Sequence, residues 1–229
     1  MNSKKKNIEA QIVEDFEKIR PAITRLLQTQ MKNDDLSLRY GRSKSNSKND
    51  IVINPSILVN TISKTNLDRD EVMIGTVVHE AIHATNNYSL DSESLNKLFP
   101  DELDDVEDID DVLEILTGPF GKYVFDILIH SIEEKIFVKQ YEGLNSILED
   151  IYTESFSEIK KLGNFSQYLS LLFHSITSYI DPEFENYKKP VVSSLNESLH
   201  ILKTLNYENV NISELIEATV QMVDICRRY

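Results

Sequence analysis

Two histidines and a glutamate lie within five consecutive residues of this chain, in the segment His79-Glu80-Ala81-Ile82-His83. Residues four apart on a helix project from one face, so His79 and His83 can present two imidazole nitrogens to the same metal ion. Glu80 lies one step further round the helix, where its carboxylate can hold a water molecule bound to that ion. The spacing predicts metal-assisted hydrolysis, with zinc as cofactor and Glu80 as general base.

A partly buried helix whose histidines form only local hydrogen bonds is the alternative interpretation of this segment. The flanking residues favour the metal site, because those on the opposite face are apolar and should bury that side of the helix, namely Ile74, Val77, Val78, Ala81 and Ile82. Gly75 lies one turn before His79 and lacks a side chain, which leaves room for a substrate or a neighbouring strand.

The elements that must position this segment can be predicted from local patterns. Asp68, with Glu71 three residues later, resembles a capping box and predicts a helix from about Arg69 to about Thr85. Apolar residues at helical spacing predict a long helix over Asn7 to Met31, with a kink at Pro21.

Two short strand-like runs lie between these helices, at Leu36 to Tyr40 and at Ile51 to Ile53. A polar stretch rich in Ser, Asn and Lys joins them, so we expect a β-hairpin. Five further helices are expected at about 122–141, 144–162, 165–180, 191–205 and 212–227, because apolar residues recur there between Gly and Pro residues.

Catalytic zinc keeps three protein ligands and one open position, so a third ligand is required. The helix around Ile-Leu-Ile-His-Ser-Ile-Glu-Glu-Lys-Ile-Phe is the only later one with acidic groups inside a strongly apolar pattern. Glu133 shares a face with isoleucines of that helix and should point inward. Glu133 is therefore one candidate for the third ligand. His130, one turn away, is the other, and in that case Glu134 would be its neighbour. The alternative is that Glu133 and Glu134 bind no metal and lie at the exposed edge of an amphipathic helix.

The motif at His79 to His83 resembles that of the zincin metallopeptidases, and the resemblance covers roughly residues 36–141. Position 89 is Ser, where metzincins place a third histidine, so the gluzincin branch fits better. The later helix resembles the Asn-x-x-Glu-Asp helix of metallopeptidase-like domains found beside von Willebrand A-type modules and in phage genomes. This resemblance implies Glu133 as the third zinc ligand, with His130 at the Asn position and Glu134 at the Asp position.

The expected fold is α+β and mostly α: a zincin-like domain with a small sheet and an active-site helix over residues 1–142, and a helical C-terminal extension over 143–229 packed on it. The segment from Asp91 to Glu114 is strongly acidic, and a solvated, disordered or weakly helical loop is expected there. Three tyrosines could supply a hydroxyl to the reaction, Tyr123, Tyr141 and Tyr152, and nothing in the sequence selects one of them.

Composition excludes several classes of protein. A net charge of -14 and a pI near 4.8 argue against a nucleic-acid partner. The single cysteine, Cys226, cannot form an internal disulfide or a cysteine zinc cluster. No apolar stretch long enough for a membrane span or a secretory signal is present, so we expect a soluble, cytoplasmic protein. His174 and His200 are expected to have ordinary helix-packing roles.

The sequence therefore predicts a zinc metallopeptidase that hydrolyses a peptide bond in a protein or peptide substrate, with basic substrates favoured by the acidic chain. Two alternatives stay open. One is a zincin-fold protein of a bacterial mobile element or phage that no longer cleaves and acts as a binding or inhibitory module. The other is a helical interaction protein that binds no metal.

Overall fold

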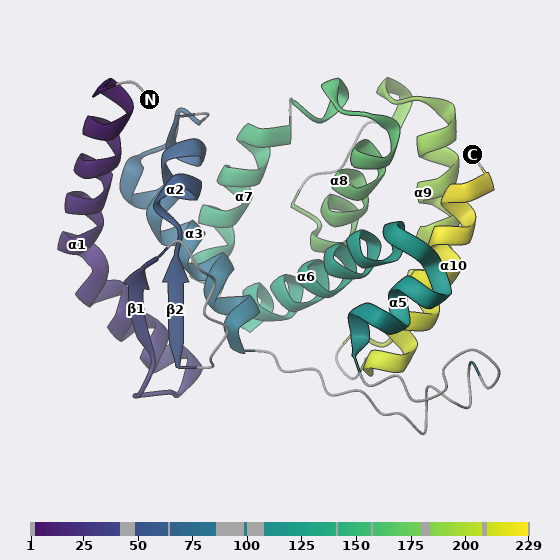
Figure 1. Cartoon of the computed structure of the whole chain (residues 1–229), viewed down its shortest axis with the longest axis horizontal. Coiled ribbons are helices and arrows are strands. Elements are labelled where there is room, and N and C mark those ends of the chain that lie inside the picture. The colour runs from purple at the N-terminus through teal and green to yellow at the C-terminus, as the bar shows by residue number, and fades with distance from the viewer. Residues whose placement is uncertain are drawn as a thin grey trace. The chain divides into compact units, whose positions relative to one another are not determined.

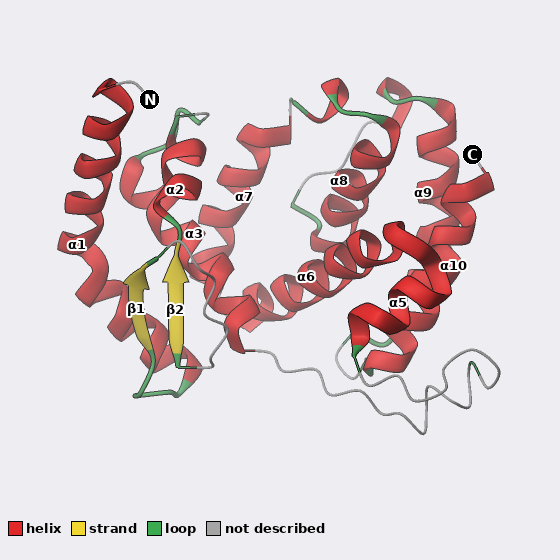
Figure 2. Ribbon diagram, in the orientation of Figure 1, coloured by secondary structure: helices red, strands yellow, loops and turns green. Residues whose placement is uncertain are grey.

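The computed structural model describes residues 3–41, 49–63, 65–85, 99, 108–140, 142–156, 158–179, 184–207 and 210–228. Within these ranges the side chains of residues 3–7, 83–85, 140, 142 and 155 are not described. The described chain is mostly helical with one small sheet, as Figures 1 and 2 show, which confirms the α+β, mostly α class. It divides into two compact units, residues 1–87 with 137–156, and residues 88–136 with 157–229.

The first unit contains the two strands and the helix that carries the histidine motif. Its elements are α1 (Ser3–Met31), β1 (Ser37–Tyr40), β2 (Asp50–Ile53), α2 (Pro55–Ile62), α3 (Arg69–Thr85) and α7 (Glu142–Phe156). Within this unit α3 packs against β2, α1, α2 and α7. The helix of the motif is therefore supported from several directions.

The two strands pair in parallel, so the predicted hairpin is wrong. Ser37 lies opposite Asp50 and Tyr40 lies opposite Ile53. The alternation of buried and exposed residues is the same for either strand direction, and it gave no information on direction. The nine residues 41–49 could span about 30 Å when extended, whereas a four-residue strand is about 13 Å long. The connection is long enough to return to the start of the first strand.

Side chains at the beginning of the sheet stabilise this register. The carboxylate of Asp50 accepts hydrogen bonds from Ser37 Oγ at 2.9 Å and from Arg39 Nε at 2.8 Å. Arg20 of α1 donates to the backbone oxygen of Leu38 at 3.3 Å. The first helix thus bonds to the strand that it packs against.

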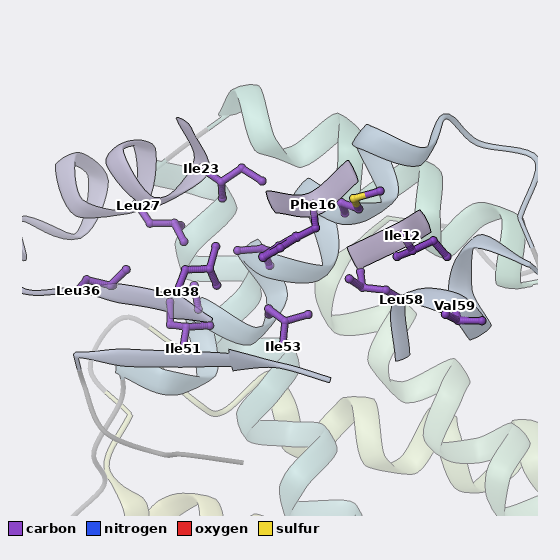
Figure 3. Packing of buried hydrophobic residues seen from close by; sticks show 13 residues of the cluster. Ile12, Phe16, Ile23, Leu27, Leu36, Leu38, Ile51, Ile53, Leu58 and Val59 are labelled. Atoms are coloured by element: carbon purple, nitrogen blue, oxygen red, sulfur yellow. The ribbon is translucent and has the colours of Figure 1, made fainter. Parts of the chain in front are cut away.

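Among the described side chains, those buried in the first unit are apolar, and Figure 3 shows 13 of them that form one cluster. They come from α1, both strands, α2 and α3. The cluster comprises Ile12, Phe16, Ile23, Leu27, Leu36, Leu38, Ile51, Ile53, Leu58, Val59, Met73, Val77 and Ala81. Because Met73, Val77 and Ala81 lie four apart on α3, their burial fixes which face of that helix points away from the core.

The bounds predicted for the helix of the motif are confirmed, since α3 runs over Arg69–Thr85. Its first turn is capped by Asp68, whose Oδ1 accepts a hydrogen bond from the backbone nitrogen of Asp70 at 2.8 Å. The long opening helix is also confirmed, and α1 continues through Pro21. Both predictions rested on local patterns that tertiary packing did not override.

The second unit contains the remaining helices: α5 (Ile109–Thr117), η1 (Gly118–Phe120), most of α6 (Gly121–Gln140), η2 (Ile159–Lys161), α8 (Asn164–Thr177), η3 (Phe184–Asn186), α9 (Lys189–Leu202) and α10 (Ile212–Arg228). In this unit α9 packs against α8 and α10, and α10 also packs against α5. A helix lies in each of the five regions predicted from apolar spacing, but the one predicted over 144–162 ends at Phe156 and belongs to the first unit.

The acidic segment predicted over Asp91 to Glu114 lies largely outside the described residues. Its last part is helical, because α5 begins at Ile109 with Asp108 as its N-cap. Val112 and Leu113 of α5 are fully buried, so this part is not a solvated loop. The apolar residues of α5 lie at helical spacing among the acidic ones, which explains how a charged sequence forms a packed helix.

The two units do not follow the predicted boundary between residues 142 and 143. Residues 88–136 belong with the C-terminal helices, and residues 137–156 belong with the N-terminal unit. The physical reason is packing, because α7 lies against α3 and α5 lies against α10. In the part of the chain that the structure describes, no helix is long and apolar enough to cross a membrane.

Candidate metal centre

Two of the residues that the sequence assigns to chemistry, His79 and Glu80, lie in the middle of α3 and reach the surface in part. His79 and Glu80 are partly exposed, whereas Val77, Val78, Ala81 and Ile82 on either side are buried. The side chain of His83 is outside the description, so the geometry of the histidine pair stays a prediction. The backbone of α3 is helical from His79 through His83, which is the condition under which residues four apart share a face.

A tyrosine from α7 contacts the first histidine. The hydroxyl oxygen of Tyr152 lies 3.0 Å from Nδ1 of His79, a hydrogen-bond distance. The two ring centroids are 6.4 Å apart with an angle of 70° between the ring planes, so the tyrosine does not stack on the imidazole. With Nδ1 engaged by Tyr152, Nε2 is the nitrogen through which His79 would bind a metal.

A glycine lies at the contact between α3 and α7. A Cβ atom on Gly75 would collide with Cδ1 of Ile151 and would lie 3.1 Å from Cγ2 of Ile147. Gly75 therefore makes room for α7, and the space predicted there for a substrate or a strand is filled by these isoleucines. Because Ile151 directly precedes Tyr152, the same helix contact brings the tyrosine to His79.

The carboxylates predicted on the later helix are buried. Glu133 is 5% exposed and Glu134 is fully buried, so the inward direction expected for Glu133 is confirmed and the exposed-edge alternative is wrong. His130, the competing ligand, is partly exposed. These three residues belong to the second unit, whereas His79 and His83 belong to the first. A site shared by the histidines and Glu133 therefore stays a prediction.

The donor set fits zinc by its chemistry. Two imidazoles and one carboxylate are ligands that catalytic zinc sites use, and the hydrogen bond to Nδ1 of His79 is the kind of support that metal-binding histidines receive. Among the described side chains, which do not include that of His83, no group of three or more His, Cys, Asp or Glu residues is arranged to hold a metal ion.

The other histidines of the second unit differ in placement: His174 has the packing role expected from the sequence, whereas the packing role expected for His200 is wrong because its side chain is exposed. His174 on α8 is 4% exposed, and burial lowers its pKa to about 4. His200 on α9 is exposed. Burial also raises the pKa of the Cys226 thiol to about 11, so at neutral pH it is protonated and a poor nucleophile.

A wide, open depression lies at the N-terminal end of α3. Its lining includes Asp15, Asn66, Asp68, Arg69 and Asp70. Arg69 and Asp15 form an ion pair there, with 3.5 Å between Nη1 and Oδ2. None of the predicted site residues lines this depression, and its carboxylates have no arrangement that would bind a metal.

Tyr152 is the residue of this site that sequence reasoning did not select. Of the three tyrosines considered, Tyr123 is 58% exposed and Tyr141 is outside the described residues. One signal in the sequence was available, because Tyr152 lies one turn after Leu148, a buried residue of α7. That signal places Tyr152 near the packed face of its helix, but it does not identify α3 as the partner.

A comparison of the chain with protein-family models, curated proteins and solved structures found no match. The zincin class is therefore a proposal. It rests on the motif in α3, on the burial of Glu133 and on the hydrogen bond between Tyr152 and His79.

Proposed function

We propose that this protein is a zinc-dependent metallopeptidase of the zincin class. His79, His83 and Glu133 would hold the metal ion, and Glu80 would act as general base. The observation that carries the proposal is the burial pattern of α3, in which His79 and Glu80 are partly exposed within an otherwise buried stretch of helix. A helix that only filled the core would not need to present these two polar groups together.

Zinc, when bound, would act as a Lewis acid and make a water molecule a stronger nucleophile at neutral pH. The carboxylate of Glu80 would accept a proton from the attacking water and deliver it to the nitrogen of the departing amine. Glu80 is suited to this role because it is adjacent to His79 in sequence but projects about 100° away around the helix. It can therefore approach the water without being a third ligand from α3.

Competing chemistries have less support. Nucleophilic catalysis by cysteine is not favoured, since Cys226 is the only cysteine and its thiol has a raised pKa. The sequence also lacks the Gly-x-Ser-x-Gly motif that positions a serine nucleophile in many hydrolases. Metal-assisted hydrolysis is the reaction for which this chain provides both a base and ligands.

The substrate class follows from charge. The chain carries 38 acidic and 24 basic residues, and the acidic stretch from Asp91 to Glu114 follows α3 directly in the sequence. A chain with this net negative charge should attract unstructured peptides that contain Lys or Arg. Exposed charges are screened beyond about 10 Å at 0.1 M salt, so the preference should weaken as salt is added.

The test compares the full-length wild type with Glu80→Gln, after both are reconstituted with zinc. Quenched fluorescent peptides with basic, neutral and acidic sequences would be incubated with each protein at two ionic strengths. Glu80→Gln should retain zinc and lose hydrolysis by at least about 100-fold, because a general base contributes about that much or more to the rate. Glu71→Gln is the matched control, since Glu71 is an exposed carboxylate on the same helix and should be dispensable.

Cleavage that depends on Glu80 and is unchanged in Glu71→Gln supports the proposal. Equal cleavage by wild type and Glu80→Gln would contradict it. If both proteins hold zinc and neither cuts any peptide or any protein of a bacterial lysate, the binding or inhibitory module becomes the better interpretation.

A further inference from the structure

We infer that Tyr152 is a positioning residue that fixes the ring orientation and tautomer of His79, so that Nε2 is the atom presented to the metal. This inference rests on the proposed function, because it assigns a role within the same site. It goes further by naming an element outside the motif, α7, as a determinant of metal affinity. No motif in the sequence assigns this role to Tyr152.

The contact has the geometry of a support for the imidazole ring. The hydroxyl oxygen of Tyr152 is 3.0 Å from Nδ1 of His79, and the ring planes meet at 70°. A tyrosine that only filled space would be expected to place its ring, rather than its hydroxyl, against the imidazole. Here the polar tip of the tyrosine meets the polar edge of the histidine.

The hydroxyl group of Tyr152 can form this hydrogen bond both with and without a bound metal ion. A phenol can donate one hydrogen bond and also accept one. Without metal, it can donate to an unprotonated Nδ1. With a metal on Nε2, Nδ1 would keep the proton and donate a hydrogen bond to the tyrosine oxygen. The same contact therefore orients the ring before binding and stabilises the metal-binding tautomer afterwards.

The position of the hydroxyl is fixed by packing. Gly75 lets Ile151 and Ile147 lie directly against α3, and Leu148 is 1% exposed. A helix packed in this way cannot easily shift along α3. The hydroxyl of Tyr152 therefore stays opposite His79. Support of a ligand from a rigid, packed element is what preserves a metal site's geometry.

The test compares zinc affinities of the full-length wild type and Tyr152→Phe by competition with a chromogenic chelator. Tyr152→Phe keeps the ring and removes only the hydroxyl, and we expect zinc binding to weaken by about 10-fold or more. Tyr123→Phe is the matched control, because Tyr123 is 58% exposed and belongs to the second unit. The melting temperature of each metal-free protein would be recorded alongside.

A second measurement separates positioning from simple stabilisation. In zinc-loaded protein with ¹⁵N-labelled histidine, NMR should show a proton on Nδ1 of His79 that exchanges slowly with water. We expect this proton to exchange faster in Tyr152→Phe, where Nδ1 has lost its acceptor, and to be unchanged in Tyr123→Phe. The His79 signals are assigned in the metal-free protein by their absence in His79→Gln, and are followed in wild type as zinc is added.

The outcomes distinguish this inference from the function on which it rests. If wild type binds no zinc, the proposed function is wrong and this inference falls with it. If wild type binds zinc and Tyr152→Phe binds it equally well, only the role of Tyr152 is wrong. If affinity falls but the Nδ1 proton is unchanged and the metal-free protein melts at a lower temperature, Tyr152 has a structural role and the inference is overturned.

Discussion

The two units of this chain differ in what they bury. Among the described side chains, every buried polar or charged residue belongs to the second unit, including Glu133, Glu134 and His174. The core of the first unit is apolar throughout, and its polar site residues His79 and Glu80 are partly exposed on α3. None of the described charged residues of the first unit is buried as a whole, whereas the second unit buries Glu133, Glu134 and His174.

This difference has consequences for what stabilises each unit. Burying an ionisable group disfavours its charged form unless a partner compensates, so the stability of the second unit should respond to pH. An apolar core has no such response. The first unit should instead respond to zinc, because a ligand that binds only the folded state shifts the folding equilibrium toward it.

Removing zinc should give the largest effect on the first unit. With free zinc at about 100 times its Kd, binding adds about 2.7 kcal/mol to the free energy of unfolding, which a chelator would remove. The melting temperature should fall by roughly 5–10 °C. His79→Ala should show no response to the chelator. Hydrogen exchange would show which helices zinc stabilises. Equal protection of α3 and α7 with and without zinc would contradict the prediction that zinc stabilises the first unit.

Acid should destabilise the second unit through His174. Its pKa is about 4 in the folded protein and near the ordinary 6.5 in the unfolded chain, so the unfolded state binds an additional proton between these values. The free energy of unfolding should fall as the pH drops from 6.5 to 4, by up to about 1.4 kcal/mol per pH unit. Urea titrations at several pH values measure this slope.

His174→Asn should reduce that pH dependence, and His200→Asn, at an exposed position, is the matched control. The comparison uses the difference between each variant and wild type, because carboxylates titrate in the same range. An identical pH profile for wild type and His174→Asn would show that burial of His174 does not contribute to acid sensitivity.

A methyl group at the contact between α3 and α7 should destabilise the first unit. Gly75→Ala places a Cβ against Cδ1 of Ile151 and 3.1 Å from Cγ2 of Ile147. We expect a net loss of about 1 kcal/mol, because crowding at the contact is partly offset by movement of the end of the Ile151 side chain and by the higher helix propensity of alanine. It should also weaken zinc binding, because α7 would shift away from His79. Gly143→Ala on α7 is the control, since its Cβ meets nothing within 4 Å, and it should be neutral or stabilising.

A smaller side chain at position 151 would test whether contact with Ile151 causes the loss of stability in Gly75→Ala. Ile151→Val removes the Cδ1 atom that the new methyl group meets, so the double variant should recover part of the lost stability. Urea unfolding measures all four proteins. If Gly75→Ala is as stable as wild type, the close helix contact does not limit the geometry of the first unit.

The third ligand can be identified from zinc affinity. Glu133→Gln should weaken zinc binding at least about 10-fold, which corresponds to about 1.4 kcal/mol. His130→Asn should have less effect, because Asn stands there in the family that the helix resembles. Chelator competition measures both. A reversed order of the two effects would identify His130 as the ligand, and no effect of either would limit the metal site to the first unit.

Local sequence patterns predicted the helices well. The cap at Asp68 and the apolar spacing after it gave the bounds of α3, and the same reasoning gave α1 and the inward direction of Glu133. These predictions succeeded because a helix is defined by neighbours three and four residues apart. The strand direction was predicted wrongly, since parallel and antiparallel pairs share one alternation pattern.

The sequence by itself determined the reactive group types, their spacing on α3, the absence of disulfide chemistry and the acidic charge. Only the tertiary structure decided that α7 packs with α3, that Gly75 admits Ile151, and that Tyr152, rather than another tyrosine, meets His79. The reason is distance along the chain. His79 and Tyr152 are 73 residues apart, and such a contact is selected by the complementary shapes of two helices rather than by the periodicity of either one.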